Sequence, residues 1–330
     1  MKKILQKLFS HQTLNRGEAE AVMLDMAEGR YSDAEIASFV TVYLMRSITI
    51  VELEGFRDAL LQKCIPARLD GFETVDIVGT GGDGKNTFNI STLACFIVAG
   101  AGQKVAKHGN YGASSISGSS NLMEELGYYF KTNDAQLKKE LSEAGICFLH
   151  APLFHTALKN VAGVRKSLGL RTIFNMLGPL ANPAAPTYQM IGVYNSEMAR
   201  IYTYMLQKTG RPFSIVHTMD GYDELSLTAD AKVVTEKGEQ VYSPVQLGKR
   251  TVQAADISGG ASVAEAAKLF VRILKGEGTW AQNAVVLANA AMALYTTKKY
   301  PAYEDAYNKA VESLESGAAL KSLQTLIQLQ

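Results

Sequence analysis

The stretch TVDIVGTGGDGKNTFNIST, residues 74–92, falls into three parts. It begins with an apolar run of strand length, breaks into four glycines within residues 79–84, and closes on Ser91 and Thr92 before a second apolar run, 93–101. A strand, a glycine-rich loop and a helix in this order suit a phosphate group, because loop amides and a helix N-terminus both attract anions. The stretch therefore predicts an α/β fold with a diphosphate site after its first strand.

From residue 71 to residue 330, strand-like and helix-like segments alternate. Further strands are expected at 103–106, 146–149, 188–193, 213–217 and 232–235, and helices at 133–145, 153–168, 196–208, 263–275, 281–296 and 302–315. Such alternation predicts a mostly parallel sheet flanked by helices, which binds ligands at the carboxyl ends of its strands. Residues 171–183, RTIFNMLGPLANP, are expected to form a buried irregular crossing or hinge.

Residues 1–70 contain no strand pattern and predict a small all-helical N-terminal domain, joined by part of 160–185. Two pairs of residues match the capping box that opens a helix: Ser32 with Glu35, and Thr49 with Glu52. A helical leader of this kind is expected to pack on the main domain or on a second subunit.

Composition excludes several classes of protein. Among 330 residues, 33 Lys and Arg balance 32 Asp and Glu, so the net charge of +1 gives no global reason to bind nucleic acid or a membrane. The three cysteines lie far apart in apolar runs, which favours buried, reduced thiols over disulfides or a metal cluster. Because no apolar run approaches the roughly 20 residues that span a bilayer, we expect a cytoplasmic protein.

The glycine-rich loop also fits two other patterns in part. Gly79, Gly81 and Gly84 match the dinucleotide motif GxGxxG. That motif needs a helix opening at its third glycine and an acid roughly 20 residues on, where this chain has Lys104 and Lys107. A nicotinamide site is therefore disfavoured.

Gly84 and Lys85 fit most of the P-loop pattern GxxxxGK[ST], but Asn86 stands where a hydroxyl would hold magnesium. Asp83 would also place a negative charge in the phosphate cradle. The remaining interpretation is a diphosphate held by backbone amides, with Asp83 and Asn89 binding hydroxyl groups or ordering the loop. A flexible surface turn is the alternative.

Three further clusters fit a site beside this loop. KHGNYGASSISGSS, residues 107–120, follows a strand and offers polar groups at Lys107, His108, Asn110, Ser114, Ser115, Ser117 and Ser119. DGYDE, residues 220–224, places Asp223 and Glu224 after a strand, and Mg²⁺ is commonly held by one or two carboxylates plus substrate phosphates. Arg165, at the edge of an apolar helix face, could pair with a carboxylate or face solvent.

Together these motifs resemble the anthranilate phosphoribosyltransferase family. The resemblance covers essentially the whole chain: the helical leader, GTGGDGKNTFNIST, KHGN with its following serines, the helix carrying Arg165, RTIFNMLGPLANP and DGYDE. It implies a fold of the nucleoside phosphorylase and phosphoribosyltransferase type, and a homodimer formed through the helical domain. The implied activity transfers the phosphoribosyl group of 5-phosphoribosyl 1-pyrophosphate to the amine of anthranilate in tryptophan biosynthesis.

The resemblance also implies roles for individual residues. Phosphoribosyl pyrophosphate would be bound by Gly79, Gly82, Asp83, Thr87, Asn89, Ile90, Ser91, Thr92, Lys107 and Ser119. Anthranilate would be held by Gly79, Asn110 and Arg165, with Arg165 facing its carboxylate. Magnesium, two ions per site, would be held by Ser91, Asp223 and Glu224.

At two positions the chain departs from the family pattern. Tyr111 stands where arginine commonly follows KHGN, and Asn121 stands where aspartate is common. Neither position belongs to the phosphate or metal set, so these departures bear on the shape of the anthranilate entrance.

The charge changes of the reaction resemble those of glycoside chemistry, with positive charge developing on the sugar and negative charge on pyrophosphate. We expect orientation and leaving-group stabilisation to carry catalysis, with Lys107 and His108 as the candidates for a direct role. One rival is a pyrimidine-nucleoside phosphorylase of the same architecture, which would need neither DGYDE nor Arg165. A catalytically silent relative that binds nucleic acid would need a basic groove.

Overall fold

The computed structural model of the chain describes residues 1–112 and 116–330. These residues form two compact units. The helical unit comprises Met1–Pro66 with Ala151–Pro183, and the α/β unit comprises Ala67–His150 with Ala184–Gln330. The expected fold class, a small helical domain and a mostly parallel sheet flanked by helices, is confirmed. Within the described residues, no helix is both long and apolar enough to cross a membrane.

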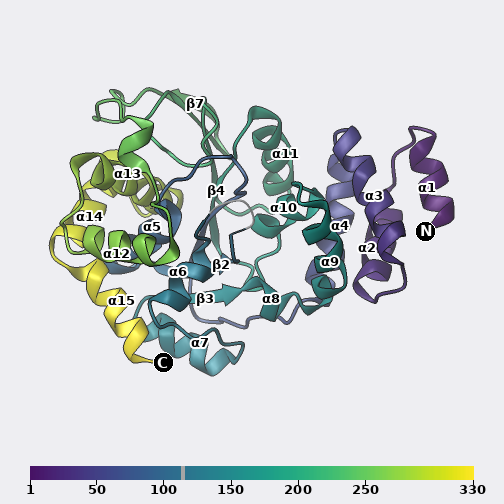
Figure 1. The fold of residues 1–330 in the computed structure, drawn as a ribbon. Coiled ribbons are helices and arrows are strands. Elements are labelled where there is room, and N and C mark those ends of the chain that lie inside the picture. The colour runs from purple at the N-terminus through teal and green to yellow at the C-terminus, as the bar shows by residue number, and fades with distance from the viewer. Residues whose placement is uncertain (113–115) are drawn as a thin grey trace. The chain divides into compact units, whose positions relative to one another are not determined.

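The helical unit is built from short helices (Figure 1). They are α1 (Lys2–Phe9), α2 (Arg16–Ala27), α3 (Asp33–Met45), α4 (Ile50–Lys63), α8 (Ala151–Phe154), α9 (Lys159–Leu168) and α10 (Ile173–Leu177), with 3₁₀ turns at Thr156–Leu158 and Gly178–Leu180. Both expected capping boxes are confirmed at the starts of α3 and α4. In the core of this unit, the ring of Phe56 meets those of Phe39 and Tyr43 edge to face, and the Phe39 and Tyr43 rings are tilted by 59° to each other.

Glu52 does more in this unit than cap α4, because its carboxylate is fully buried. One oxygen accepts hydrogen bonds from the Leu14 N–H at 3.0 Å, the Tyr43 hydroxyl at 3.1 Å and Arg46 Nη2 at 2.6 Å. The other accepts from the Thr49 N–H and hydroxyl and from Arg46 Nη1. The burial of this charge is thus offset by an ion pair and a complete set of donors.

The α/β unit is organised on one seven-stranded sheet with the order β3-β2-β1-β4-β5-β6-β7. Its strands are β1 (Thr74–Gly79), β2 (Lys104–Gly109), β3 (Ile146–His150), β4 (Tyr188–Gly192), β5 (Phe213–Thr218), β6 (Ala231–Thr235) and β7 (Gly238–Tyr242). The strands from β3 to β5 pair in parallel, whereas β6 and β7 are antiparallel additions at one edge. Parallel strands bring their carboxyl ends to one edge of the sheet.

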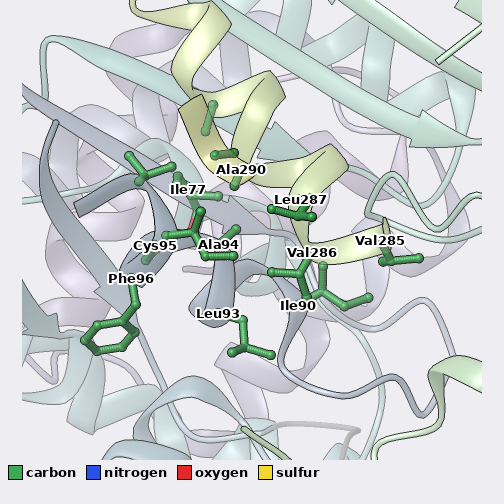
Figure 2. Close-up of a cluster of buried hydrophobic side chains, with 14 of the residues drawn as sticks. Ile77, Ile90, Leu93, Ala94, Cys95, Phe96, Val285, Val286, Leu287 and Ala290 are labelled. Carbon is green, nitrogen blue, oxygen red and sulfur yellow. Dashed lines mark hydrogen bonds between the residues drawn. The ribbon is translucent and has the colours of Figure 1, made fainter. Parts of the chain in front are cut away.

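The helices of this unit are α5 (Ile90–Gly100), α6 (Ser119–Glu125), α7 (Asp134–Glu143), α11 (Ser196–Gln207), α12 (Val263–Leu274), α13 (Trp280–Thr296), α14 (Tyr303–Glu315) and α15 (Ala318–Gln328). Helix α5 is apolar all round and packs against both β1 and α13. Figure 2 shows Leu93 and Ala94 of α5 with Ile77 of β1 and with Val286 and Ala290 of α13. The start of α5, where the glycine-rich loop ends, is therefore fixed by a close-packed core.

Several local expectations differ from the structure. The helix expected over 153–168 is interrupted near His155, and only its second half, α9, continues as a regular helix. Residues 171–183, expected to be irregular, form α10 and a 3₁₀ turn instead. Among the described residues, four further helices and strands were not expected, α1, α6, β7 and α15, and neither was the 3₁₀ helix Ala254–Ile257. Cys95 and Cys147 are buried free thiols as expected, but Cys64 is only half-buried.

Candidate functional site

The order of the strands changes direction between β1 and β4, where an open α/β sheet has its binding crevice. The two strands end in register at Gly79 and Gly192. A Cβ on Gly79 would overlap the carboxylate of Asp223, and a Cβ on Gly192 would overlap its backbone carbonyl. Glycine at both strand ends therefore makes the space that Asp223 occupies.

The acidic turn after β5 is tied directly to the glycine-rich loop. Asp223 Oδ2 accepts a hydrogen bond from the Gly81 N–H at 2.7 Å, although 142 positions separate them. The turn is fixed from the strand side as well, because the Thr218 hydroxyl donates to the backbone carbonyl of Glu224 at 2.5 Å. The structure thus brings together the first loop and the acidic pair, as the sequence suggested.

The acidic pair is buried, with Asp223 and Glu224 each 8% exposed. Burial and the nearby charge of Asp83 raise the pKa of Asp223 to about 7. Burial, and then the charge of Asp223, raise the pKa of Glu224 well above its usual range, while Lys107 acts in the opposite direction. Without a metal, the buried pair therefore favours bound protons over negative charge, and a divalent cation would favour the ionised carboxylates.

The oxygen-bearing side chains at this place suit the coordination of Mg²⁺. The backbone N–H of Ser91 hydrogen-bonds to Glu224, which puts the start of α5 next to the acidic pair. In the described ranges, no three His, Cys, Asp or Glu side chains form a ready-made metal cluster. Two carboxylates and a hydroxyl suit Mg²⁺, which usually completes its shell with water and substrate phosphates.

The glycine-rich loop is ordered by bonds within itself and to a distant segment. Asp83 Oδ1 accepts from the Lys85 N–H at 2.9 Å. Thr87 forms an isolated antiparallel bridge with Ser258, and the Gly259 N–H donates to the Asn86 carbonyl at 2.8 Å. A flexible surface turn, the alternative left open by the sequence, does not describe such a loop.

At the start of α5, Asn89 is the N-cap residue but makes no side-chain cap. Its side-chain amide donates instead to the Ser117 carbonyl at 2.9 Å. This bond links the glycine-rich first loop to the second polar loop, which lies within residues 107–120. No side chain caps α5, so the positive end of this helix can attract an anion, although the Ile90 N–H already donates to the Phe88 carbonyl at 2.6 Å. The loop and this first turn carry most of the residues to which the sequence assigned phosphoribosyl pyrophosphate: Gly79, Gly82, Asp83, Thr87, Asn89, Ile90, Ser91 and Thr92.

Lys107 and His108 lie near the end of β2 and are both buried, at 2% and 4% exposed. Lys107 Nζ donates to the Ile77 carbonyl of the neighbouring strand β1 at 2.7 Å. The His108 backbone N–H donates to Asp76 Oδ1 at 3.2 Å. Lys107 is thus a buried side chain close enough to Glu224 to lower that residue's pKa.

The second polar loop turns back onto the start of α6. The Asn110 carbonyl accepts from the Ser120 N–H at 3.1 Å and from the Ser119 hydroxyl at 3.4 Å. A Cβ on Gly109 would collide with the Ser119 side chain. Ser114 and Ser115, expected to line a polar pocket, lie outside the described residues.

Arg165 belongs to the helical unit and lies on α9. Its guanidinium stands over the ring of Phe174, 5.5 Å from the ring centroid, and burial lowers its pKa. A guanidinium with an aromatic ring beneath it and little water around it can bind a carboxylate strongly.

Sequence reasoning missed three features that hold the site together. Gly192 gave no signal, because its need for glycine comes from Asp223, far along the chain. Asn289 of α13 is fully buried and exchanges hydrogen bonds with the backbone of Leu225, next to the acidic pair. A buried asparagine within the apolar run 281–296 was a usable signal. The segment 257–260 carries two adjacent glycines, which alone do not identify a partner for the first loop.

Comparison with known families gives matches to both units. Residues 71–320 match the family described as "Glycosyl transferase family, a/b domain", and residues 2–64 match "Glycosyl transferase family, helical bundle domain". The anthranilate phosphoribosyltransferase of Cytophaga hutchinsonii is 54% identical over 319 residues, which are 97% of each chain. That of Flavobacterium psychrophilum is 53% identical over 329 residues, 100% of this chain and 99% of the relative.

Two solved structures are similar over almost the whole length. Anthranilate phosphoribosyltransferase from Thermus thermophilus superposes with a TM-score of 0.91 at 34% identity and covers 98% of both chains. The enzyme from Saccharomyces cerevisiae in complex with PRPP and Mg has a TM-score of 0.91 at 28% identity and covers 98% of this chain and 96% of that one.

Proposed function

Since the chain belongs to the anthranilate phosphoribosyltransferase family of glycosyl transferases, we propose how its residues divide the work of binding two substrates. The chain is a transferase of tryptophan biosynthesis. It joins the phosphoribosyl group of phosphoribosyl pyrophosphate (PRPP) to the amine of anthranilate, giving N-(5-phosphoribosyl)anthranilate and pyrophosphate.

The proposed PRPP site is the glycine-rich loop with the first turn of α5. The observation that carries this proposal is the hydrogen bond from the Gly81 N–H to Asp223, because it places the acidic pair at the phosphate loop. The glycine-rich loop and the N-terminal end of α5, which no side chain caps, would receive the diphosphate, and Lys107 and Ser119 would complete its surroundings. A structure of the yeast enzyme contains PRPP and Mg, which supports the same ligands here.

Ser91, Asp223 and Glu224 are proposed to hold Mg²⁺, with two ions per site. Structures of the yeast enzyme contain Mg, and the buried, uncompensated carboxylates of this chain suit it. When bound, Mg²⁺ neutralises negative charge on the departing pyrophosphate. The carboxylates would be held in place for this by Gly81 and Thr218.

Anthranilate is proposed to bind at Gly79, Asn110 and Arg165. Asn110 Oδ1 accepts from the Tyr111 N–H at 2.8 Å, so its amide nitrogen is left to donate. An amide donor and the guanidinium of Arg165 both suit a carboxylate. A variant of the yeast enzyme has been solved with 4-fluoroanthranilate, an analogue of this substrate.

Catalysis is proposed to rest on orientation and on stabilisation of the leaving group. As the C1–O bond to pyrophosphate breaks, the amine forms the new C1–N bond, and the amine proton passes to solvent. The loop amides would stabilise the charge that develops on the diphosphate. His108 remains a candidate for a direct role. A pH profile of turnover with one essential base that disappears in His108→Ala would contradict catalysis by orientation alone.

The test uses the natural fluorescence of anthranilate, which should fall when the chain, PRPP and Mg²⁺ are combined. Replacing both Asp223→Asn and Glu224→Gln should abolish this turnover, because the carboxylates would no longer bind the metal. Asp220→Asn is the matched control, since Asp220 lies in the same turn but bonds to Thr228 and is exposed. No fluorescence change with the unmodified chain would defeat the activity, and an active double variant would defeat the metal assignment. A homodimer formed through the helical unit and a cytoplasmic location stay predictions.

A further inference from the structure

The end of β3 supports the second polar loop in a way that the sequence did not suggest. Gly109, the last residue of β2, is the register partner of His150, the last residue of β3. His150 is 4% exposed, and the ring of Phe130 stacks on it with centroids 4.3 Å apart and an interplanar angle of 15°. The ring of Tyr111 meets the same imidazole edge to face at 4.8 Å. Tyr111 therefore packs on an aromatic base that the sheet itself positions.

Helix α6 holds the other side of the loop. The Tyr111 hydroxyl donates to Glu124 Oε1 at 2.7 Å. Ser120, on the same helix, makes a 2.8 Å hydrogen bond through its hydroxyl to His150 Nδ1, and its backbone N–H donates to the Asn110 carbonyl. Residues 110 and 111 are thus gripped between the end of β3 and helix α6.

The next residue of the loop is fixed by Asn121, also on α6. Its Oδ1 accepts from the backbone N–H groups of Gly112 and Gly118 at 2.9 and 3.1 Å. Gly118 lies so close to this part of the loop that a Cβ on it would collide with the backbone of Gly112 and Tyr111. Every residue from 110 to 112 therefore has a bond or ring contact that fixes its backbone.

This arrangement determines which way Asn110 faces. Because Tyr111 is held by its ring and hydroxyl, its backbone N–H stays aimed at Asn110 Oδ1. That bond fixes the orientation of the amide and leaves the amide nitrogen on the opposite side, oriented to donate to a carboxylate. A side chain already held in its binding orientation costs less entropy when the ligand arrives.

We propose that Tyr111 is a positioning residue for anthranilate: it acts through Asn110, and it does so by resting on His150 and bonding to Glu124. The inference deepens the proposed function and rests on it. PRPP binding is expected to depend less on Tyr111, because Asp223 and segment 257–260 hold the first loop, although the proposed PRPP ligand Ser119 bonds to the Asn110 carbonyl.

The test separates the two Michaelis constants. Tyr111→Ala removes ring and hydroxyl and should raise KM for anthranilate about tenfold, with a much smaller change in KM for PRPP. Tyr111→Phe keeps the ring and loses only a partly exposed hydrogen bond, so its rise should be about threefold or less. Glu124→Gln keeps an acceptor for the Tyr111 hydroxyl, so both of its Michaelis constants should stay close to those of the unmodified chain.

Tyr204→Ala on α11 is the matched control, because Tyr204 is 49% exposed and Tyr111 is 42% exposed. If Tyr111→Ala does not fold, Tyr111→Phe and Glu124→Ala, which both remove the bond between ring hydroxyl and helix, decide by the same comparison. An equal rise in both Michaelis constants, or a fall in kcat alone, would overturn the role of Tyr111. The proposed function would survive that result, since it fails only if the unmodified chain gives no turnover.

Discussion

Replacing Glu52 by glutamine should destabilise the helical unit far more than the loss of an ordinary helix cap. Glutamine keeps the shape of the side chain but exchanges one acceptor oxygen for an NH₂ group. Each Glu52 oxygen accepts hydrogen bonds from three donors. In either orientation of the glutamine amide, its NH₂ group would therefore point at three groups that also donate. The hydroxyls of Tyr43 and Thr49 can rotate to accept, whereas one backbone N–H and one guanidinium N–H cannot.

The magnitude follows from these two orphaned donors. A buried donor left without a partner costs about 1–3 kcal/mol, and breaking a buried ion pair costs about 3–5 kcal/mol. Because Arg46 keeps 21% of its side chain exposed, water can reach it in part, and we expect about 3 kcal/mol. With an unfolding entropy of about 2.1 cal/mol/K per residue, a chain of 330 residues that unfolds as one unit loses about 1.4 °C per kcal/mol, so the midpoint of thermal unfolding should fall by about 4 °C.

The matched control is Glu18→Gln, the same change in the capping box of α2. Glu18 pairs with Lys7 near the surface, and an exposed pair contributes less than about 1 kcal/mol. Both variants should be compared with the unmodified chain by thermal and denaturant unfolding followed by circular dichroism.

The pH dependence gives a second check of the same reasoning. Burial alone would raise the pKa of Glu52, but bonds from Arg46, Leu14 and Thr49 outweigh it and leave the pKa below its usual range. A lowered carboxyl pKa means that this stabilisation is present above the unfolded value of about 4.3 and is lost as pH falls through the folded pKa. The deficit of Glu52→Gln should therefore shrink in acid. A deficit no larger than that of Glu18→Gln near neutral pH, or one that is constant down to acid, would refute the argument.

Three further predictions concern the α/β unit and the thiols. Gly192→Ala should lower stability by about 1–3 kcal/mol and PRPP-dependent turnover at least about tenfold, because the new Cβ displaces Asp223. Gly163→Ala is the control: its Cβ meets open space in α9, so it should stabilise the chain by about 0.5–1 kcal/mol. Equal effects of the two variants in unfolding and turnover assays would contradict this reasoning. Since the folded pKa of Asp223 is raised to about 7, the metal-free folded chain binds a proton there from about pH 4 to 7 that the unfolded chain does not, and its stability falls as pH rises through that window. Mg²⁺ should therefore raise the unfolding midpoint more at one unit above pH 7 than at one unit below. Equal gains at the two pH values would count against the metal site. In the folded chain a thiol reagent should react with half-buried Cys64 alone, since burial raises the pKa of Cys95 to about 12, and rapid modification of more than one thiol would disprove it.

Local chemistry explains why much of the fold could be predicted. The capping boxes at Ser32 and Thr49 involve only four consecutive residues, so the sequence contains all of the information for them. Buried strands such as β4 and β5 are short apolar runs and were predicted to within a residue or two. Strand β7 was not predicted, because it is an exposed edge strand whose polar sequence, GEQVY, does not alternate apolar and polar residues.

The site was predictable as a set of loops but not as a set of contacts. Glycines and acids at strand ends mark a phosphate and metal site because few other chemistries need them there. What fixes them is long-range: Gly192 makes room for Asp223, Asn289 fixes the next residue, and His150 supports Tyr111. Each of these residues has an ordinary local environment in the sequence, and only the folded chain gives it a partner.

The bond between Asn86 and Gly260 spans 174 positions and has a consequence for biosynthesis. As a nascent chain leaves the ribosome, the first loop appears early but lacks segment 257–260, which completes its hydrogen bonds. Long loops must close before such contacts form, so this closure belongs to the later events of folding. A chain released before residue 260 would carry the whole glycine-rich motif but lack the segment that completes the hydrogen bonds of this loop.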